Sequence, residues 1–177
     1  MMTSFSAHPK AENNNSKIFM CVFFAVGAVA IILSSFIERY TWVLGLVALA
    51  SITTAILMYT KYVSVDFYYD VLADDEEPIF VVRQSVGKRS VTMCRVPLAD
   101  IVSIKKETKE ERKNHKRASG VSLFVYAPTM FPKTSYRIFV SNRYEKSEVV
   151  LEGSDEFFAK LDELARAARE MRTDSED

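Results

Sequence analysis

Two uncharged apolar runs of 20 residues follow each other near the start of the chain, at 18–37 and 41–60. About 20 helical residues span the roughly 30 Å hydrocarbon core of a bilayer, because each residue rises about 1.5 Å. Only Glu38, Arg39 and Tyr40 separate the two runs, so two helices formed by them must run antiparallel. The sequence therefore predicts a transmembrane hairpin with both ends of the chain on the same side of the membrane.

Basic residues flank this hairpin unevenly. Lys10, Lys17 and Lys61 lie on the side of the two termini. The connector carries Arg39 alone, beside Glu38. Because basic residues favour the cytoplasmic side of a membrane, we expect an integral membrane protein with both termini in the cytoplasm. Neither run contains an Asp, Glu, Lys, Arg or His residue, which argues against an ion or proton pathway.

The remainder of the chain divides into a tail and one soluble domain. Residues 1–17 are polar, and we expect them to be disordered. Residues 61–172 have the length of one small domain, and 173–177 form a short acidic tail. The whole chain has 23 Lys and Arg residues against 23 Asp and Glu residues. Such a balance gives no support for nucleic-acid binding.

Alternation of apolar and polar residues predicts seven strands in the soluble domain. The clearest signal is the pair 79–86 and 89–96, joined by Gly87 and Lys88 in a tight polar turn. The other expected strands are 62–72, 101–106, 121–126, 135–140 and 148–151. Ser154 and Asp155 offer a helix N-cap, and apolar residues then recur at helical spacing. This pattern predicts a C-terminal amphipathic helix over 155–171.

Seven antiparallel strands followed by one amphipathic helix is the element order of pleckstrin-homology-like (PH-like) domains. With two apolar runs ahead of it, the chain resembles the bacterial PH-like membrane proteins. The resemblance is carried by the paired runs and by IFVVRQSVGKRSVTMCRV at 79–96, PLADIVSI at 97–104 and GSDEFFAKLDEL at 153–164. It implies an α+β soluble domain with a seven-stranded antiparallel barrel or sandwich, in a bacterial plasma membrane. It implies no reaction.

The segment 105–117 (KKETKEERKNHKR) has no apolar residue and is the most function-like part of the chain. Its cations are candidate contacts for anionic lipid headgroups or an acidic partner: Lys105, Lys106, Lys109, Arg112, Lys113, Lys116 and Arg117. Beside an anionic leaflet, each cation contributes about 1 kcal/mol. Interleaved glutamates also permit a solvated segment with internal ion pairs, and the sequence leaves helix and loop both open.

No motif in the chain predicts catalysis, a metal ion or a cofactor. The two cysteines lack CxxC or Cys/His metal spacing. His8 and His115 have no nucleophile or carboxylate at a recognisable spacing. We therefore predict a non-catalytic interaction or scaffold module that holds a protein partner, or further copies of itself, at the membrane. The alternatives are anionic-lipid sensing through 105–117 and an unrecognised membrane enzyme.

Overall fold

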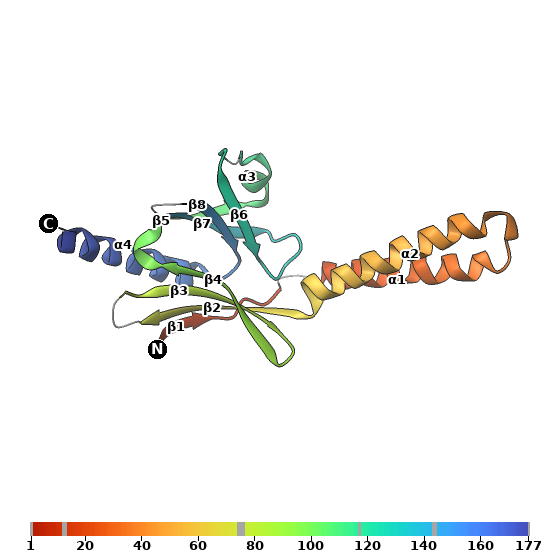
Figure 1. Cartoon of the computed structure of the whole chain (residues 1–177), viewed down its shortest axis with the longest axis horizontal. Helices are drawn as coiled ribbons and strands as arrows, with labels where there is room; N and C mark the ends of the chain where they lie inside the picture. The colour runs from red at the N-terminus through yellow and green to blue at the C-terminus, as the bar shows by residue number, and fades with distance from the viewer. Residues whose placement is uncertain (1, 12–13, 74–76, 117, 143–144, 177) are drawn as a thin grey trace. The chain divides into compact units, whose positions relative to one another are not determined.

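The chain forms two compact units, shown in a computed structural model that describes residues 2–11, 14–73, 77–116, 118–142 and 145–176 (Figure 1). One unit comprises Glu12–Val65 and contains two long helices. The other joins Met1–Ala11 to Asp66–Asp177 and contains the sheets and the C-terminal helix. The unit with the sheets is thus built from chain segments on both sides of the two helices.

Both long helices are apolar and long enough to cross a membrane. Helix α1 (Asn15–Ser34) and helix α2 (Thr41–Met58) are joined by the 3-10 turn η1 (Glu38–Tyr40). A π-helical turn, η2 (Tyr59–Val63), follows α2. Helix α1 begins and ends three residues earlier than the apolar run 18–37, because Asn15 to Lys17 continue the helix and Ser35 begins the turn.

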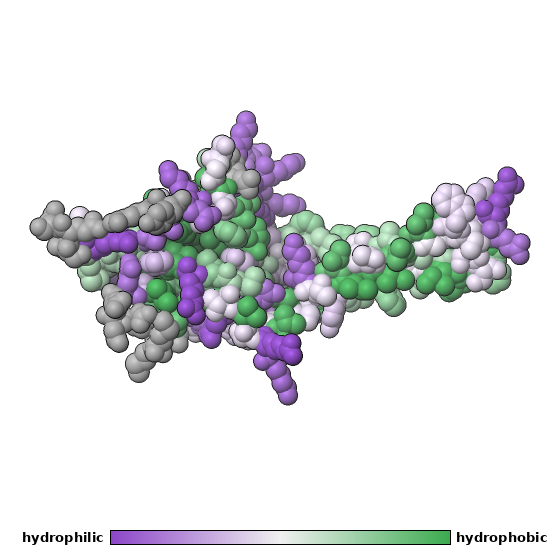
Figure 2. Space-filling view, viewed as in Figure 1, coloured by the Kyte–Doolittle hydropathy of each residue, from purple (hydrophilic) through white to green (hydrophobic). Residues whose placement is uncertain are grey.

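Most large side chains of these two helices are not covered by other parts of the protein. Only 17% of the most apolar window of each helix is buried, whereas a core helix of a soluble protein is mostly buried. Phe24 is 62% exposed and Trp42 is 71% exposed. The apolar surface runs along both helices in Figure 2. A helix that is apolar all round needs apolar surroundings, so this exposure favours a bilayer over a protein core.

The two helices pack on each other through small residues. Gly27 and Ala30 of α1 are buried, as are Ala48, Ser51 and Ala55 of α2. A Cβ atom added at Gly27 would lie 2.8 Å from Cγ1 of Ile52 and 3.4 Å from the carbonyl oxygen of Ala48. Small residues at such a contact let two backbones approach closely. The absence of a side chain at Gly27 therefore sets the helix separation.

We expect Gly27→Leu to destabilise the helix pair by about 1–3 kcal/mol, because the added side chain forces α1 and α2 apart. The matched control is Gly45→Leu, since nothing lies within 4 Å of a Cβ atom built at Gly45. Thermal unfolding of the full chain in micelles, followed by helical circular dichroism, measures both variants. Equal unfolding temperatures for the two variants would contradict the packing described above.

The first sheet has the strand order β1-β2-β3-β4. Its strands are β1 (Met2–Ala7), β2 (Val65–Ala73), β3 (Ile79–Val86) and β4 (Arg89–Pro97). Strands β3 and β4 form the predicted hairpin, in which Val86 is paired with Arg89. Gly87 adopts a φ of 60° at the tip. Positive φ at the first central residue alone is the pattern of a type II′ turn, which explains the glycine.

Strand β1 corrects the expectation that residues 1–17 are disordered. It pairs antiparallel with β2, with Ala7 opposite Tyr69. The ring of Phe5 lies 5.0 Å from the ring of Phe157, which anchors β1 to the C-terminal helix. The pairing partner is remote in the sequence, so the local composition of the tail gave no sign of it. Because β1 precedes α1 and β2 follows α2, their pairing requires both ends of the helix pair to lie on one side.

The second sheet has the strand order β5-β7-β8-β6. Its strands are β5 (Ile101–Thr108), β6 (Val121–Tyr126), β7 (Thr134–Ser141) and β8 (Lys146–Leu151). Two further short elements are η3 (Leu98–Asp100) and α3 (Lys109–Asn114). Strand β6 pairs with β8 in parallel, whereas β5 with β7 and β7 with β8 are antiparallel.

The expected seven-stranded antiparallel barrel is therefore wrong in its arrangement. Each of the seven expected strands is present, two with the expected ends (79–86 and 121–126) and five with shifted ends, and β1 is added to them. In the described part of the chain the strands form two sheets of four, and the pairing of β6 with β8 is parallel. The parallel pair arises because β8 lies between β7 and β6, so that β6 and β7 are consecutive but not neighbours. Alternation along a strand identifies its faces and not its neighbours, so it did not predict this order.

Helix α4 (Asp155–Glu176) covers the core with one apolar side. The ring of Phe158 stacks on the ring of Tyr136 of β7, with centroids 3.9 Å apart. Leu161 and Ala165 are fully buried. The helix is longer than the expected 155–171 and includes most of the expected acidic tail, 173–177. Its later turns are held by Arg172, which donates to Asp100 of η3 at 2.8 Å.

Candidate functional site

The basic segment 105–117 is part strand and part helix. Strand β5 continues to Thr108, and α3 starts at Lys109. Thr108 caps α3: its side chain accepts from the backbone N–H of Glu111, whose Oε2 accepts from the backbone N–H of Thr108 at 2.7 Å. This reciprocal capping box satisfies two N–H groups that a helix start leaves free. The sequence left helix and loop both open for this segment, and in the structure Lys109–Asn114 are helical.

Two of the seven candidate cations are bound within the domain. Nζ of Lys106 lies 2.7 Å from both carboxylate oxygens of Asp155 at the start of α4. The hydrogen bond from Lys106, followed by one from Tyr136, lowers the pKa of the Asp155 carboxyl. Arg112 donates to the carbonyl oxygen of Pro132 at 2.8 Å and to Oγ of Ser135 at 3.0 Å. Lys106 and Arg112 therefore connect structural elements.

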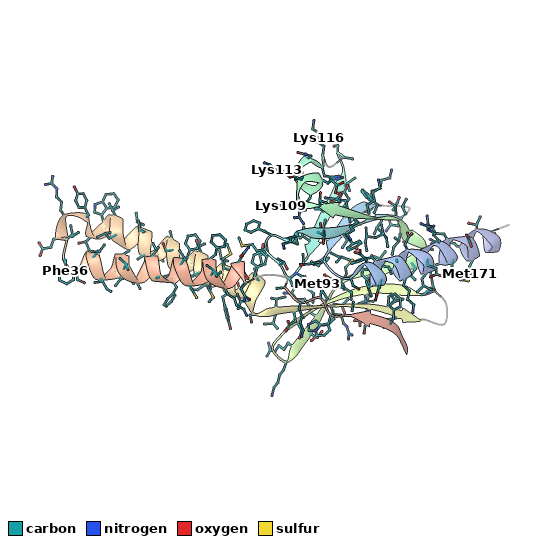
Figure 3. All side chains as sticks on the ribbon, turned by 180° about the vertical axis from the view of Figure 1, so that it is seen from behind. Phe36, Met93, Lys109, Lys113, Lys116 and Met171 are labelled. Carbon is teal, nitrogen blue, oxygen red and sulfur yellow. The ribbon has the colours of Figure 1, made fainter. Side chains whose placement is uncertain are left out.

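Three other lysines lie on the outer side of α3 and the residues after it. Lys109, Lys113 and Lys116 are exposed and are directed away from the sheets in Figure 3. Lys105 differs from them, because its Nζ lies 5.5 Å from the ring centre of Phe139. Arg117 lies outside the described residues. The six described candidate cations therefore do not converge on one headgroup pocket. We call the group formed by Lys109, Lys113 and Lys116 the α3 lysine face.

A buried ion-pair cluster lies under α3 and was not predicted from the sequence. Arg137 of β7 makes a bidentate contact with Glu107 of β5, with N–O distances of 2.7 and 2.8 Å. Its third donor reaches Oε2 of Glu148 on β8 at 2.5 Å. All three residues are buried. Burial alone would lower the pKa of Arg137, but the hydrogen bonds and charges of Glu107 and then Glu148 outweigh it and raise the pKa.

His115 closes this cluster on the side of α3. Its Nε2 lies 3.3 Å from Oε2 of Glu148, and its Nδ1 lies 3.8 Å from Oε1 of Glu107. The histidine thus contacts both carboxylates that Arg137 holds. Sequence reasoning found no carboxylate partner for His115, because Glu148 is separated from it by two strands. The available signal was Arg137 directly before Ile138 and Phe139, and Glu148 directly before Val149 and Val150, since a charge inside an apolar strand needs a partner.

A shallow groove of about 380 Å³ lies beside this cluster on the second sheet. Its floor includes Phe139 and Val121, and its charged lining residues are Lys105, Lys146 and Glu148. Within the described ranges, no group of three or more His, Cys, Asp or Glu side chains could hold a metal ion. Cys94 of β4 is half-buried, and burial raises the pKa of its thiol, which disfavours the thiolate.

Apolar side chains are exposed along two edge strands of the β-domain. On β6 they are Leu123 and Phe124, each 41% exposed, and Val125, 59% exposed. On the β3–β4 hairpin they are Val86, Val91 and Met93. Strands β4 and β6 both lie at the end of their sheets. At these two places several exposed apolar side chains lie close together in the chain, whereas Val102, Phe131 and Met171 are exposed singly.

Comparison with known proteins adds no assignment to these surfaces. No protein-family model, no curated protein and no solved structure matches the chain. The PH-like resemblance stays a hypothesis, and the functional argument depends on the surfaces themselves.

Proposed function

We propose that this chain is a membrane-anchored, non-catalytic interaction module with its β-domain on the cytoplasmic side of a bacterial plasma membrane. The exposed apolar surface of α1 and α2 supports the anchor. The pairing of β1 with β2 supports a hairpin whose ends share one side. Lys10, Lys17 and Lys61 support the cytoplasmic orientation. A PH-like relationship is supported by the strand hairpins and the C-terminal helix, while the parallel pairing of β6 and β8 departs from it.

The observation that carries the interaction proposal is the edge of strand β6. Its sequence, VSLFVY, has no charge and no proline. Among the described residues β6 pairs with β8 alone, so no strand covers its other edge, while Tyr69 donates to the carbonyl oxygen of Tyr126 at the end of β6. Natural proteins protect open strand edges with charges, prolines or bulges, because such edges pair readily with other chains. An unprotected apolar edge of this kind suits the addition of an extended segment from a partner protein.

The α3 lysine face indicates the charge of this partner. Residues 115–120 alone connect α3 to β6, and α3 lies near the start of this strand (Figure 1). Lysine side chains at the rim of an interface steer partners of opposite charge and suppress partners of like charge. We therefore assign the β6 edge to a partner segment with apolar residues and acidic neighbours. A second copy of this chain is the competing occupant.

Site-specific photo-crosslinking in native membranes tests the proposal. A photoreactive side chain at Val125 of the full chain is expected to yield one defined adduct with a different protein. The matched control is Val102 on β5, the other edge of the same sheet, where the valine is exposed but its apolar neighbours Ile101 and Ile104 are not. Reversing Lys109, Lys113 and Lys116 to glutamate is expected to reduce the Val125 adduct at least about fivefold, roughly 1 kcal/mol.

Three results would overturn this assignment. Equal yields of adduct from Val125 and Val102 would mean that the β6 edge does not bind a partner selectively. An adduct of twice the chain mass would assign the edge to a second copy. The third result is that Val125 crosslinks to lipid alone and that reversing the three lysines abolishes these crosslinks. It would favour the lipid-sensing alternative for 105–117.

A further inference from the structure

The tip of the β3–β4 hairpin lies at the end of the first sheet where the chain enters and leaves the two apolar helices. Ser64 alone separates the turn η2 from the start of β2. Strands β2 and β3 are neighbours joined by residues 74–78, so the end of β3 lies beside the start of β2 (Figure 1). Strand β1 ends there as well, because Ala7 is opposite Tyr69.

These connections hold that end of the sheet close to any bilayer that contains the helices. Strand β4 is two positions from β2, which at about 4.8 Å per strand is roughly 10 Å. The one-residue connection at Ser64 leaves little reach, since an extended residue spans at most about 3.6 Å. The hairpin tip is therefore joined to the end of η2 by a short path through the first sheet.

The composition of the tip suits that location. Val86 is 46% exposed, Val91 is 60% exposed and Met93 is 43% exposed. The pairing register places Val86 opposite Arg89, so apolar and basic side chains share the hairpin. Lys88 is exposed at the turn itself. Figure 2 shows apolar and basic surface adjoining at the free end of this hairpin. This mixture is typical of segments that enter the headgroup region of an anionic bilayer.

We propose that the β3–β4 tip, formed by Val86, Gly87, Lys88, Arg89 and Val91, docks into the anionic headgroup region of the bilayer that holds α1 and α2. The contact is shallow and non-specific: the valines enter the interface and Lys88 and Arg89 pair with lipid phosphates. It fixes the orientation of the β-domain and leaves the β6 edge free for a partner. This inference rests on the membrane anchor of the proposed function and is independent of the protein partner.

Lipid quenching of a single fluorophore tests the docking. The native cysteines of the full chain are removed by Cys21→Ala and Cys94→Ala, and an environment-sensitive fluorophore is attached at Val91→Cys. The labelled chain is inserted into nanodiscs of phosphatidylcholine and phosphatidylglycerol. Lipids brominated near the headgroup are expected to quench this label at least twofold. The control label at Lys113→Cys, on α3, is expected to change little. Nanodiscs of phosphatidylcholine alone, and the Lys88→Glu, Arg89→Glu variant, are expected to lose most of the quenching.

Two outcomes would overturn the docking. The first is a Val91 label that is quenched no more than the Lys113 label. The second is quenching that is unchanged both in nanodiscs without anionic lipid and in the charge-reversed variant. Such a result would show that Lys88 and Arg89 do not hold the tip at anionic headgroups. Co-purification of the chain with the nanodisc measures separately whether α1 and α2 are inserted in the bilayer. A chain that is not anchored and a tip that does not dock therefore give different results.

Discussion

Replacing Arg137 with methionine is expected to destabilise the β-domain by about 3–5 kcal/mol, because it leaves two buried carboxylates without their counter-ion. Glu107 and Glu148 are both buried, and Arg137 supplies three of their hydrogen bonds. His115 contacts the same carboxylates only at 3.3 Å or more, so it cannot replace the guanidinium. A typical domain is stabilised by about 5–15 kcal/mol, so this loss is roughly a fifth of the total or more.

Pulse proteolysis of the full chain in urea measures this effect. With a urea dependence of about 1–3 kcal/mol per molar, the unfolding midpoint is expected to fall by at least about 1 M. The control is Arg166→Met, because Arg166 is 69% exposed and pairs with Asp162 on the surface of α4. Surface pairs contribute about 0–1 kcal/mol, so the control midpoint is expected to change little.

A second set of variants distinguishes loss of charge pairing from loss of packing. Adding Glu107→Gln and Glu148→Gln to Arg137→Met removes the unpaired charges and is expected to restore part of the lost stability. A midpoint unchanged by Arg137→Met would contradict the buried ion-pair cluster. A triple variant less stable than Arg137→Met would show that the carboxylates are not the source of the destabilisation.

Phe158→Ala is expected to cost about 3–5 kcal/mol, the usual cost of truncating a buried phenylalanine. Phe158 is 2% exposed, stacks on Tyr136 and meets the ring of Phe157 edge-on. Its ring also lies 3.1 Å from where a Cβ atom of Gly153 would be, so the site is already closely packed. The alanine variant leaves a cavity between α4 and the second sheet.

The matched control is Glu163→Ala, an exposed position on the same helix. Exposed substitutions of this kind change stability by about 0.5 kcal/mol or less. Amide hydrogen exchange of the full chain measures both variants, with β7 and α4 expected to lose protection together in Phe158→Ala. Loss of protection in α4 alone would contradict the account of the core, since the helix would then be a separate unit.

The sequence predicted those parts of the fold that depend on local pattern. The two apolar runs predicted both long helices, and alternation identified the strands from β2 to β8. The N-cap residues before Phe157 identified the start of α4. These signals depend on neighbouring residues in the chain, since periodicity and capping are local properties.

Pairings between remote segments were not predictable in this way. Strand β1 is stabilised by β2 and Phe157, which lie far along the chain, so residues 2–7 alone resemble a polar tail. The parallel pairing of β6 with β8 depends on which strand lies between them. The buried ion-pair cluster was not predictable for the same reason, because Glu107, Arg137 and Glu148 come from three different strands. The basic segment was recognised as a unit, yet Lys106 and Arg112 turned out to bind within the domain.

The central claim is that two membrane-crossing helices return the chain to the side on which it began, where β1 joins the β-domain. Labelling of intact cells with a membrane-impermeant maleimide tests it, using single cysteines at Ser6, Arg39 or Lys113 in a chain with Cys21→Ala and Cys94→Ala. We expect the Arg39→Cys connector to be labelled from outside, and Ser6→Cys and Lys113→Cys to react only after the cells are opened. Labelling of Ser6→Cys but not Lys113→Cys from outside would place the two ends on opposite sides and contradict the account.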